Sequence, residues 1–205
     1  MSEQYQYIDV DFKYTYEETG VLKNLANITD ENDLLFFEST LVTKRQSQLN
    51  DKPLKINGID TLFEIHKHLF QDVYEWAGKQ RVTEISKKGK PFFPLLHFKT
   101  ALKYIDSLIS EYQAIDANDT DKISKKLAQI LDNVNYLHPF REGNGRTQRE
   151  FIRTLALEKG YILNLNPPDN IEVYEQYMNG TINGDIETLK DLIEKNILKN
   201  KQIEK

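Results

Sequence analysis

One twelve-residue stretch, HPFREGNGRTQR at 138–149, holds the side chains needed to bind a polyphosphate and to activate a hydroxyl group. His138 is a natural general base, because its unperturbed pKa lies near physiological pH. Glu142 is a hard oxygen ligand, which suits Mg²⁺ on phosphates. Arg146 and Arg149 lie three residues apart on one expected helix face, where both guanidinium groups can reach phosphate oxygens.

The order of these residues predicts how the chain presents them. An apolar pattern from about 121 to 137 indicates a helix that ends at His138, since Pro139 disfavours helical geometry in the residue before it. Residues 143–145 read Gly-Asn-Gly and supply a turn, and the apolar pattern resumes after Arg146 as a second helix. A glycine turn before a helix start places backbone N–H groups around an anion.

Asn144, inside this turn, can donate its amide to a phosphoryl oxygen as negative charge develops there. A purely structural interpretation is also open, in which the stretch is a helix end, a turn and an amphipathic helix with a charged face. That interpretation explains each residue singly, but it does not explain why all of them occur together.

The stretch resembles the signature of the Fic family, H-x-F-x-(D/E)-G-N-G-R-x-x-R. Every specified position matches, namely His138, Phe140, Glu142, Gly143, Asn144, Gly145, Arg146 and Arg149. Two other segments are similar to that family. VYEWAG at 73–78, followed by Arg81, resembles its approach to a β-hairpin flap, and residues 36–42 resemble its opening helix. The resemblance covers about residues 31–197.

The resemblance implies an all-α, Fic-like helical bundle with a small β-hairpin flap. It implies transfer of AMP from ATP to a Ser, Thr or Tyr hydroxyl of a target protein, with release of pyrophosphate. His138 would deprotonate that hydroxyl, and Glu142 would hold Mg²⁺ on the α- and β-phosphates. The phosphates would be bound by Gly143, Asn144, Gly145, Arg146 and Arg149, the last of these at the γ-phosphate.

Gly145 separates this chain from the related Doc toxins, which resemble the signature but carry lysine at that position and act as kinases. A lysine there adds charge and bulk to the phosphate cradle, so Gly145 favours nucleotidyl transfer over phosphoryl transfer. Phosphoryl transfer or removal of AMP at the same site stays open, as does an inactive nucleotide-binding interaction module. His138 and Glu142 argue against the inactive module, because a protein that only binds has no need of a base.

Residues 81–94 have the strongest strand pattern of the chain, and the turn at 88–89 predicts a hairpin. Unpaired hairpin edges can capture an extended segment of a partner. By the Fic resemblance, the hairpin would align the target through Val82, Thr83, Glu84 and Ile85. Tyr174 and Tyr177 are candidates for an adenine pocket, because the family's nucleotide base rests against this region; ordinary core packing is an equal alternative.

Amphipathic patterns predict the helices that position this site. They cover residues 31–49, 59–78, 98–112, 121–137, a segment after 146, and about 171–178 and 184–198. We expect a single domain over residues 1–205 with its core at about 31–197, and less order in residues 1–20 and 199–205.

Composition narrows the classes of function. The 205 residues include no cysteine, which excludes disulfides and thiolate zinc sites. The net charge of −5, from 27 basic and 32 acidic residues, gives no general footprint for nucleic acid. The start lacks a secretory pattern, and no apolar run approaches the roughly 20 residues of a membrane span. We therefore expect a cytoplasmic enzyme without a direct nucleic-acid or membrane partner.

Regulation is suggested by a missing pattern. Fic proteins are often inhibited by a helix with (S/T)-x-x-x-E-(G/N), whose Glu pairs with the second motif arginine. The two S/T-x-x-x-E patterns here, at 107–111 and 154–158, are followed by Tyr112 and Lys159 instead. We therefore expect a toxin-like protein that a separate small antitoxin-like protein inhibits; a diverged internal helix stays open.

Overall fold

Helices make up most of the fold. The computed structural model describes residues 5–7, 12–87 and 89–200. The α-helices in these ranges are α1 (Glu31–Asp51), α2 (Asp60–Phe70), α3 (Phe98–Gln113), α4 (Thr120–Leu137), α5 (Asn144–Glu158), α6 (Ile171–Asn183) and α7 (Ile186–Asn196). Their positions confirm the predicted all-α class. None of these helices is both long and apolar enough to cross a membrane.

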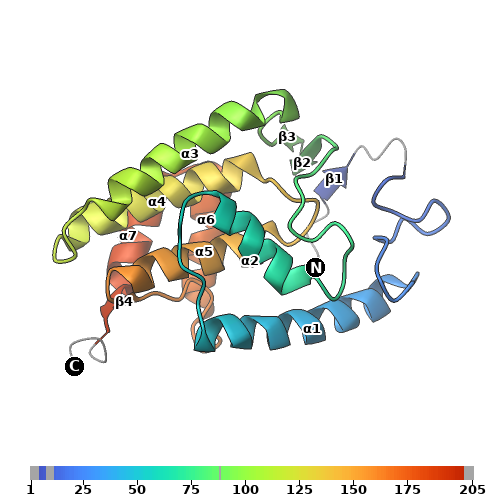
Figure 1. Cartoon of the computed structure of the whole chain (residues 1–205), viewed down its shortest axis with the longest axis horizontal. Helices are drawn as coiled ribbons and strands as arrows, with labels where there is room; N and C mark the ends of the chain where they lie inside the picture. The colour runs from blue at the N-terminus through green and yellow to red at the C-terminus, as the bar shows by residue number, and fades with distance from the viewer. Residues whose placement is uncertain (1–4, 8–11, 88, 201–205) are drawn as a thin grey trace.

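Helix α4 is the central element. The helices α3, α5, α6 and α7 all contact it, and α3 and α4 lie side by side in Figure 1. Its apolar stripe is buried along the whole helix, as its spacing predicts. The stripe consists of Ile123, Leu127, Ile130, Leu131, Val134 and Leu137. Because α4 leads directly into His138, this central helix fixes where that residue lies.

Helix α2 ends earlier than the apolar pattern indicates. The prediction placed its end near Gly78, whereas the helix stops at Phe70. The Phe70 carbonyl accepts the N–H groups of both Val73 and Tyr74, at 2.9 and 3.0 Å, and the chain turns there. Val73 and Tyr74 are buried in this turn. Their apolar side chains therefore indicate a buried segment and do not indicate that the helix continues. Such a turn cannot be separated from a helix end by periodicity alone.

The predicted hairpin is present and belongs to a larger sheet. Strands β2 (Ile85–Lys87) and β3 (Lys90–Pro91) pair antiparallel, with Lys87 opposite Lys90. Strand β1 (Tyr5–Tyr7), which the sequence does not predict, pairs with the other edge of β2, giving the order β1-β2-β3. Both edges of the central strand are therefore occupied.

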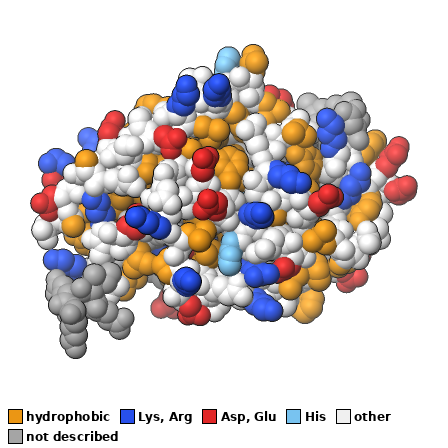
Figure 2. Space-filling model, in the orientation of Figure 1, with side chains coloured by type: hydrophobic (Ala, Val, Ile, Leu, Met, Phe, Trp, Pro, Cys, Tyr) orange, Lys and Arg blue, Asp and Glu red, His pale blue; other side chains and the backbone are white. Residues whose placement is uncertain are grey.

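The two ends of the chain contribute more pairing than expected. Residues 1–4, 8–11 and 201–205, where less order is predicted, lie outside the described residues. Near the other end, β4 (Tyr161–Ile162) pairs with β5 (Leu198–Lys199). On the face seen in Figure 2, basic and acidic side chains are interspersed and neither gathers into a large patch.

Candidate active site

The loop 138–143 connects α4 to α5 and carries the chemistry of the twelve-residue stretch. His138, just after α4, has φ 45° and ψ 61°, and Gly143, just before α5, has φ 81°. A Cβ at Gly143 would lie 2.3 Å from a ring carbon of Phe70, so glycine alone fits there. These two left-handed residues turn the chain so that the His138 ring and the N-terminus of α5 border one cavity.

This cavity has a volume of about 1400 Å³ and lies between α1, α4, α5, α6 and the hairpin. It brings together most of the residues expected from the sequence. His138, Glu142, Gly143, Gly145, Arg146 and Arg149 line it, and so do Tyr174 and Tyr177. Asn144 and the expected flap residues 82–85 are not among the described residues of its lining.

The His138 ring is held by α4 and by the hairpin. Its Nδ1 lies 3.1 Å from the carbonyl oxygen of Asn135, and the ring of Phe92 stacks on it with 3.7 Å between centroids. A carbonyl oxygen can only accept, so this contact favours the tautomer with the proton on Nδ1. Nε2 is then unprotonated, which is the state that a general base requires.

Asn144 is used by the loop itself. Its side-chain oxygen accepts the N–H of Phe140 at 3.0 Å, and its amide donates to the carbonyl of Phe140 at 2.8 Å. The sequence suggested that this amide would donate to a phosphate. In this structure both ends of the amide bind the Phe140 backbone, and the side chain is buried. Asn144 thereby closes the turn, while its role at a phosphate stays a prediction.

Arg146 lies between two carboxylates. Its Nη1 is 2.6 Å from Oε1 of Glu38 on α1, and its Nη2 is 3.4 Å from Oε1 of Glu142. The guanidinium also lies over the ring of Phe70, with Cζ 4.7 Å from the centroid. Burial opposes its charge, but Glu38 and Glu142 outweigh that effect and raise the pKa of Arg146. A permanently charged side chain thus faces the cavity.

Arg149 lies against aromatic rings. Its Cζ is 5.5 Å from the ring centroid of Tyr174 and 5.3 Å from that of Tyr177. The Tyr177 ring is only 1% exposed, and its hydroxyl accepts the amide of Gln148. Tyr177 therefore packs against Arg149 from the core side. A Cβ at Gly145 would lie 3.2 Å from Nη1 of Arg149, so glycine permits this close approach.

Arg81 links the loop to the hairpin. Apart from the family resemblance, no pattern in the sequence pointed to this residue. Its fully buried guanidinium donates to the carbonyls of His138 (2.9 Å), Thr83 (2.7 Å) and Phe93 (2.6 Å). It also pairs with Glu84 at 3.2 Å. Burial lowers the pKa of Arg81, and Glu84 opposes that shift. One side chain thus fixes the His138 backbone relative to both limbs of the hairpin.

The expected flap residues lie directly before and at the start of strand β2, and their role in aligning a target stays a prediction. Thr83 and Glu84 bind Arg81, Ile85 is buried in the sheet, and the N–H of Val82 donates to the Tyr14 hydroxyl at 3.0 Å. They hold the hairpin against the body of the protein. The return limb borders the cavity instead, through Lys90, Pro91 and Phe92.

His66 holds the other end of the loop. The Gly78 N–H donates to its Nδ1 at 2.8 Å, so Nε2 carries the proton and donates to the Glu142 carbonyl at 3.0 Å. The ring stacks on Phe140 with 3.8 Å between centroids. Burial lowers the pKa of His66 to about 3, so this residue stays neutral. It is a structural histidine that orients the residue expected to bind metal.

Glu142 is the candidate metal ligand. No group of three or more His, Asp or Glu side chains suited to metal occurs in the described part of the chain. A single carboxylate in an anion-binding cavity still fits Mg²⁺, which often binds through one protein carboxylate together with phosphates and water. The Oε1 atom of Glu142 also accepts the Gly143 N–H at 2.8 Å, which orients the carboxylate.

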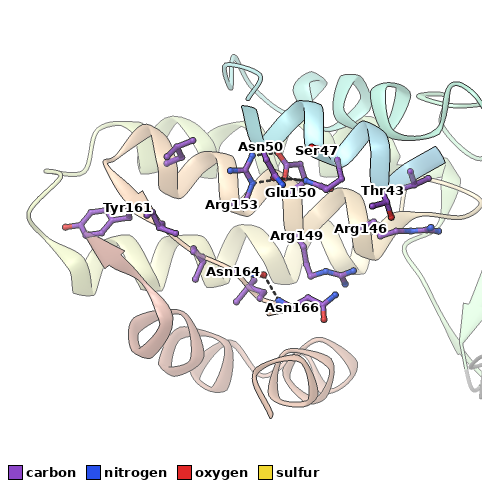
Figure 3. A pocket seen from close by; sticks show the side chains of 16 residues that line it. Thr43, Ser47, Asn50, Arg146, Arg149, Glu150, Arg153, Tyr161, Asn164 and Asn166 are labelled. Atoms are coloured by element: carbon purple, nitrogen blue, oxygen red, sulfur yellow. Dashed lines mark hydrogen bonds and ion pairs between the residues drawn. The ribbon is translucent and has the colours of Figure 1, made fainter. Parts of the chain in front are cut away.

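A second cavity of about 610 Å³ lies between α1, α5 and the segment 161–166 (Figure 3). Its walls are rich in uncharged polar side chains, among them Thr43, Ser47, Asn50, Asn164 and Asn166. Arg146 and Arg149 line both cavities, so the two meet at these arginines. In Figure 3, Arg149 lies between α5 and the segment that carries Asn164 and Asn166.

Comparisons with known proteins agree with this geometry. A family model described as the Fic/DOC family matches residues 55–156. The chain is 35% identical to the probable protein adenylyltransferase y4lH of Sinorhizobium fredii over 160 residues, which are 77% of this chain and 82% of that protein. It is 40% identical to the protein adenylyltransferase VbhT of Bartonella schoenbuchensis over 151 residues, but these cover 72% of this chain and only 31% of VbhT.

Among solved structures, BepC protein from Bartonella tribocorum, a VirB-translocated effector protein crystallised with bound AMPPNP, is similar with a TM-score of 0.80. The match has 25% sequence identity and covers 93% of this chain and 98% of the other. The fold, including the positions of the helices around the loop 138–143, is therefore shared with that protein.

Replacing Arg81 tests the role of its buried guanidinium. Arg81→Met removes the donor to three backbone carbonyls, and we expect the free energy of unfolding to fall by about 3 kcal/mol or more. Urea denaturation measures this change. Glu84→Gln is the matched control, because Glu84 is 57% exposed and its loss should cost less than about 1 kcal/mol. Equal effects of the two substitutions would contradict the assignment.

His66 predicts a pH dependence of stability. Its pKa is about 3 in the folded protein and about 6.5 in the unfolded chain, so below pH 6.5 the unfolded chain binds one more proton. The free energy of unfolding should therefore decrease as pH falls from 6.5 toward 3, by up to about 1.4 kcal/mol per pH unit. Urea titrations at several pH values measure the slope of the unfolding free energy against pH. In His66→Gln this slope should be smaller by the contribution of one proton, about 1.4 kcal/mol per pH unit. An unchanged slope would show that His66 does not titrate on unfolding.

Proposed function

The chain belongs to the Fic/DOC family, and from that premise we propose that it is a protein adenylyltransferase. It moves AMP from ATP to a hydroxyl side chain of a target protein and releases pyrophosphate. The observation that carries this proposal is the placement of His138, the α5 N-terminus and Arg149 around one cavity. Two relatives named as protein adenylyltransferases, at 40% and 35% identity, support it. So does the AMPPNP bound in the similar BepC structure.

His138 starts the reaction as general base. Nε2 takes the proton of the target hydroxyl, whose oxygen then forms a bond to the α-phosphorus of ATP. The bond between the α-phosphorus and the oxygen that bridges to the β-phosphate breaks, and pyrophosphate leaves with that electron pair. Positioned proton transfer of this kind is worth roughly 10²–10⁴-fold in rate. The Nδ1 contact with Asn135 favours the required tautomer before the proton transfer and orients the ring after it.

The phosphates bind at the start of α5. The Gly143 N–H already donates to Glu142, so the backbone N–H of Gly145 and the positive end of the helix dipole are what favour negative charge there. Arg146 and Arg149 add two cations on the cavity wall. Glu142 would hold Mg²⁺, which supplies further neutralisation of the α- and β-phosphates when bound. We assign Asn144 the role of closing the loop beneath these groups.

Gly145 and Arg149 support transfer of AMP over transfer of the γ-phosphate. Because residue 145 has no side chain, Arg149 can lie against the backbone of the turn and reach the outer phosphates. A longer side chain at 145 would displace that guanidinium and move the nucleotide relative to His138. We place the adenine near Tyr174 on the open side of the cavity, since the Tyr177 ring is covered.

The target protein would bind along the return limb of the hairpin. Strand β1 takes one edge of β2, and β3 takes the other. The Phe92 N–H donates to Ile85 within the hairpin, so the backbone of Pro91 faces away from β2. Pro91 has no N–H, so this outer edge offers its carbonyl as the acceptor for an extended target segment, next to the Phe92 ring that stacks on His138. The modified residue would be a Ser, Thr or Tyr at this point.

The second cavity suits an inhibitory partner. It has both apolar and polar walls and opens onto Arg149, which has no acidic partner among the ion pairs of the described residues. A small antitoxin-like protein could insert a helix there and place one carboxylate on Arg149, forming a charge-assisted pair that excludes the γ-phosphate. We therefore propose that this cytoplasmic enzyme is toxin-like and active by itself.

Labelled ATP distinguishes the proposed reaction from its alternatives. With purified protein, Mg²⁺ and cell extract, label on the α-phosphate should move to protein, whereas label on the γ-phosphate should not exceed the background of the extract. His138→Ala should lower the transfer by roughly 10²-fold or more while the fold is kept. Transfer of the γ-label alone would overturn the proposal in favour of a kinase.

Removal of the chain ends tests where inhibition comes from. We expect the full chain to transfer AMP without a partner, and deletion of residues 1–11 or 201–205 should not raise the rate, because no inhibitory carboxylate is expected there. Steady-state rates of α-label transfer measure this, and toxicity on overproduction in a bacterial host is the second readout. A many-fold increase after either deletion would mean that inhibition is intramolecular.

A further inference from the structure

One buried carboxylate in the larger cavity has no part in the proposed chemistry. Glu38, on the α1 wall, is only 5% exposed. Its Oε1 atom lies 2.6 Å from Nη1 of Arg146, and its Oε2 atom accepts a hydrogen bond from the Tyr74 hydroxyl. Burial raises the pKa of Tyr74, so this hydroxyl keeps its proton and remains a donor. Glu38 is thus bound from two sides and held in one orientation.

Arg146 is shared unequally between two carboxylates. Glu38 makes the short contact of 2.6 Å, whereas Glu142, four residues before Arg146, makes a contact of 3.4 Å. Charge-assisted pairs are strongest at about 2.7–2.9 Å, so the pair with Glu142 is the weaker one. Without the Glu38 charge, Arg146 would pair more closely with Glu142. That pairing would occupy the carboxylate that the proposed reaction needs for its cation.

We propose that Glu38, oriented by Tyr74, is a positioning residue that retains Arg146 on the α1 side of the cavity and thereby keeps Glu142 available to a divalent cation. This inference rests on the proposed function, because it assumes that a nucleotide and its cation bind at the loop. It adds two residues outside the twelve-residue stretch to the metal and phosphate site.

The geometry fits positioning better than competition with the phosphate. A guanidinium has five N–H donors, and Glu38 contacts Nη1, which leaves donors on the other side for phosphate oxygens. The ring of Phe70 supports the guanidinium at 4.7 Å and limits how far it can turn. Arg146 can therefore keep its contact with Glu38 while it binds a nucleotide.

Calorimetric titration of ADP into the full chain tests this inference without relying on turnover. Each titration is carried out with Mg²⁺ and with EDTA, and the ratio of the two affinities gives the gain due to the cation. In Glu38→Gln we expect this gain to fall by about 10-fold or more, as for other residues that orient a metal ligand. Affinity for ADP in EDTA should change much less, because Arg146 remains in the cavity.

Two further variants complete the experiment. Tyr74→Phe removes the hydrogen bond that orients Glu38 and should lower the same gain to a smaller extent; it carries the test if Glu38→Gln does not fold. Asp72→Asn is the matched control, because it removes the carboxylate of a more exposed ion pair with Arg45 and should leave the gain unchanged. Thermal unfolding confirms that each variant is folded.

An unchanged Mg²⁺-dependent gain in folded Glu38→Gln would overturn the inference, and so would tighter binding of MgADP, which would mean that Glu38 competes with phosphate for Arg146. Either result leaves the proposed function in place, provided that the unmodified chain binds MgADP. Failure of the unmodified chain to bind ADP at all would instead overturn the proposed function, and this inference with it.

Discussion

The site depends on one constraint, which is that polar side chains from other parts of the chain bind several backbone groups of the loop 138–143. Arg81 binds the His138 carbonyl, Asn144 binds both backbone groups of Phe140, and His66 binds the Glu142 carbonyl. Buried carbonyls without donors are costly, so each of these side chains stabilises the loop by an amount that the loop alone cannot supply. His138 and Gly143 have left-handed backbone geometry, which is unfavourable for histidine. The hydrogen bonds to the loop offset that cost.

Function follows from what this loop brings together. Once the loop is fixed, His138 at the end of α4 and the N-terminus and two arginines of α5 face the same cavity. Arg81 extends the constraint to the hairpin, so the edge that would hold the target has a fixed position relative to His138. The guanidinium of Arg146 is positioned by Glu38 from α1, and that of Arg149 by two tyrosine rings from α6. The proposed base, phosphate site and target edge are therefore parts of one connected arrangement.

Local patterns predicted the elements but not their tertiary contacts. The apolar stripe of α4 and the break at Pro139 indicated where the helix ends, since both effects are properties of a short segment. The third strand, Tyr5–Tyr7, could not be predicted, because its partner lies about eighty residues away and the strand is only three residues long. The sequence spacing of Glu38 and Arg81 does not reveal their contacts, because their partners lie far away in the sequence. The sequence also could not show that the Asn144 amide binds the Phe140 backbone, because that contact depends on how the loop folds.

The central claim is that His138 directs a hydroxyl to the α-phosphorus of a nucleotide held at the start of α5. The intact mass of a target protein purified after incubation with the chain, ATP and Mg²⁺ tests this claim most directly. The account predicts a gain of one AMP group at a Ser, Thr or Tyr, and no gain with the His138→Ala variant. A gain of one phosphate group, or an AMP gain that persists in the variant, would contradict it.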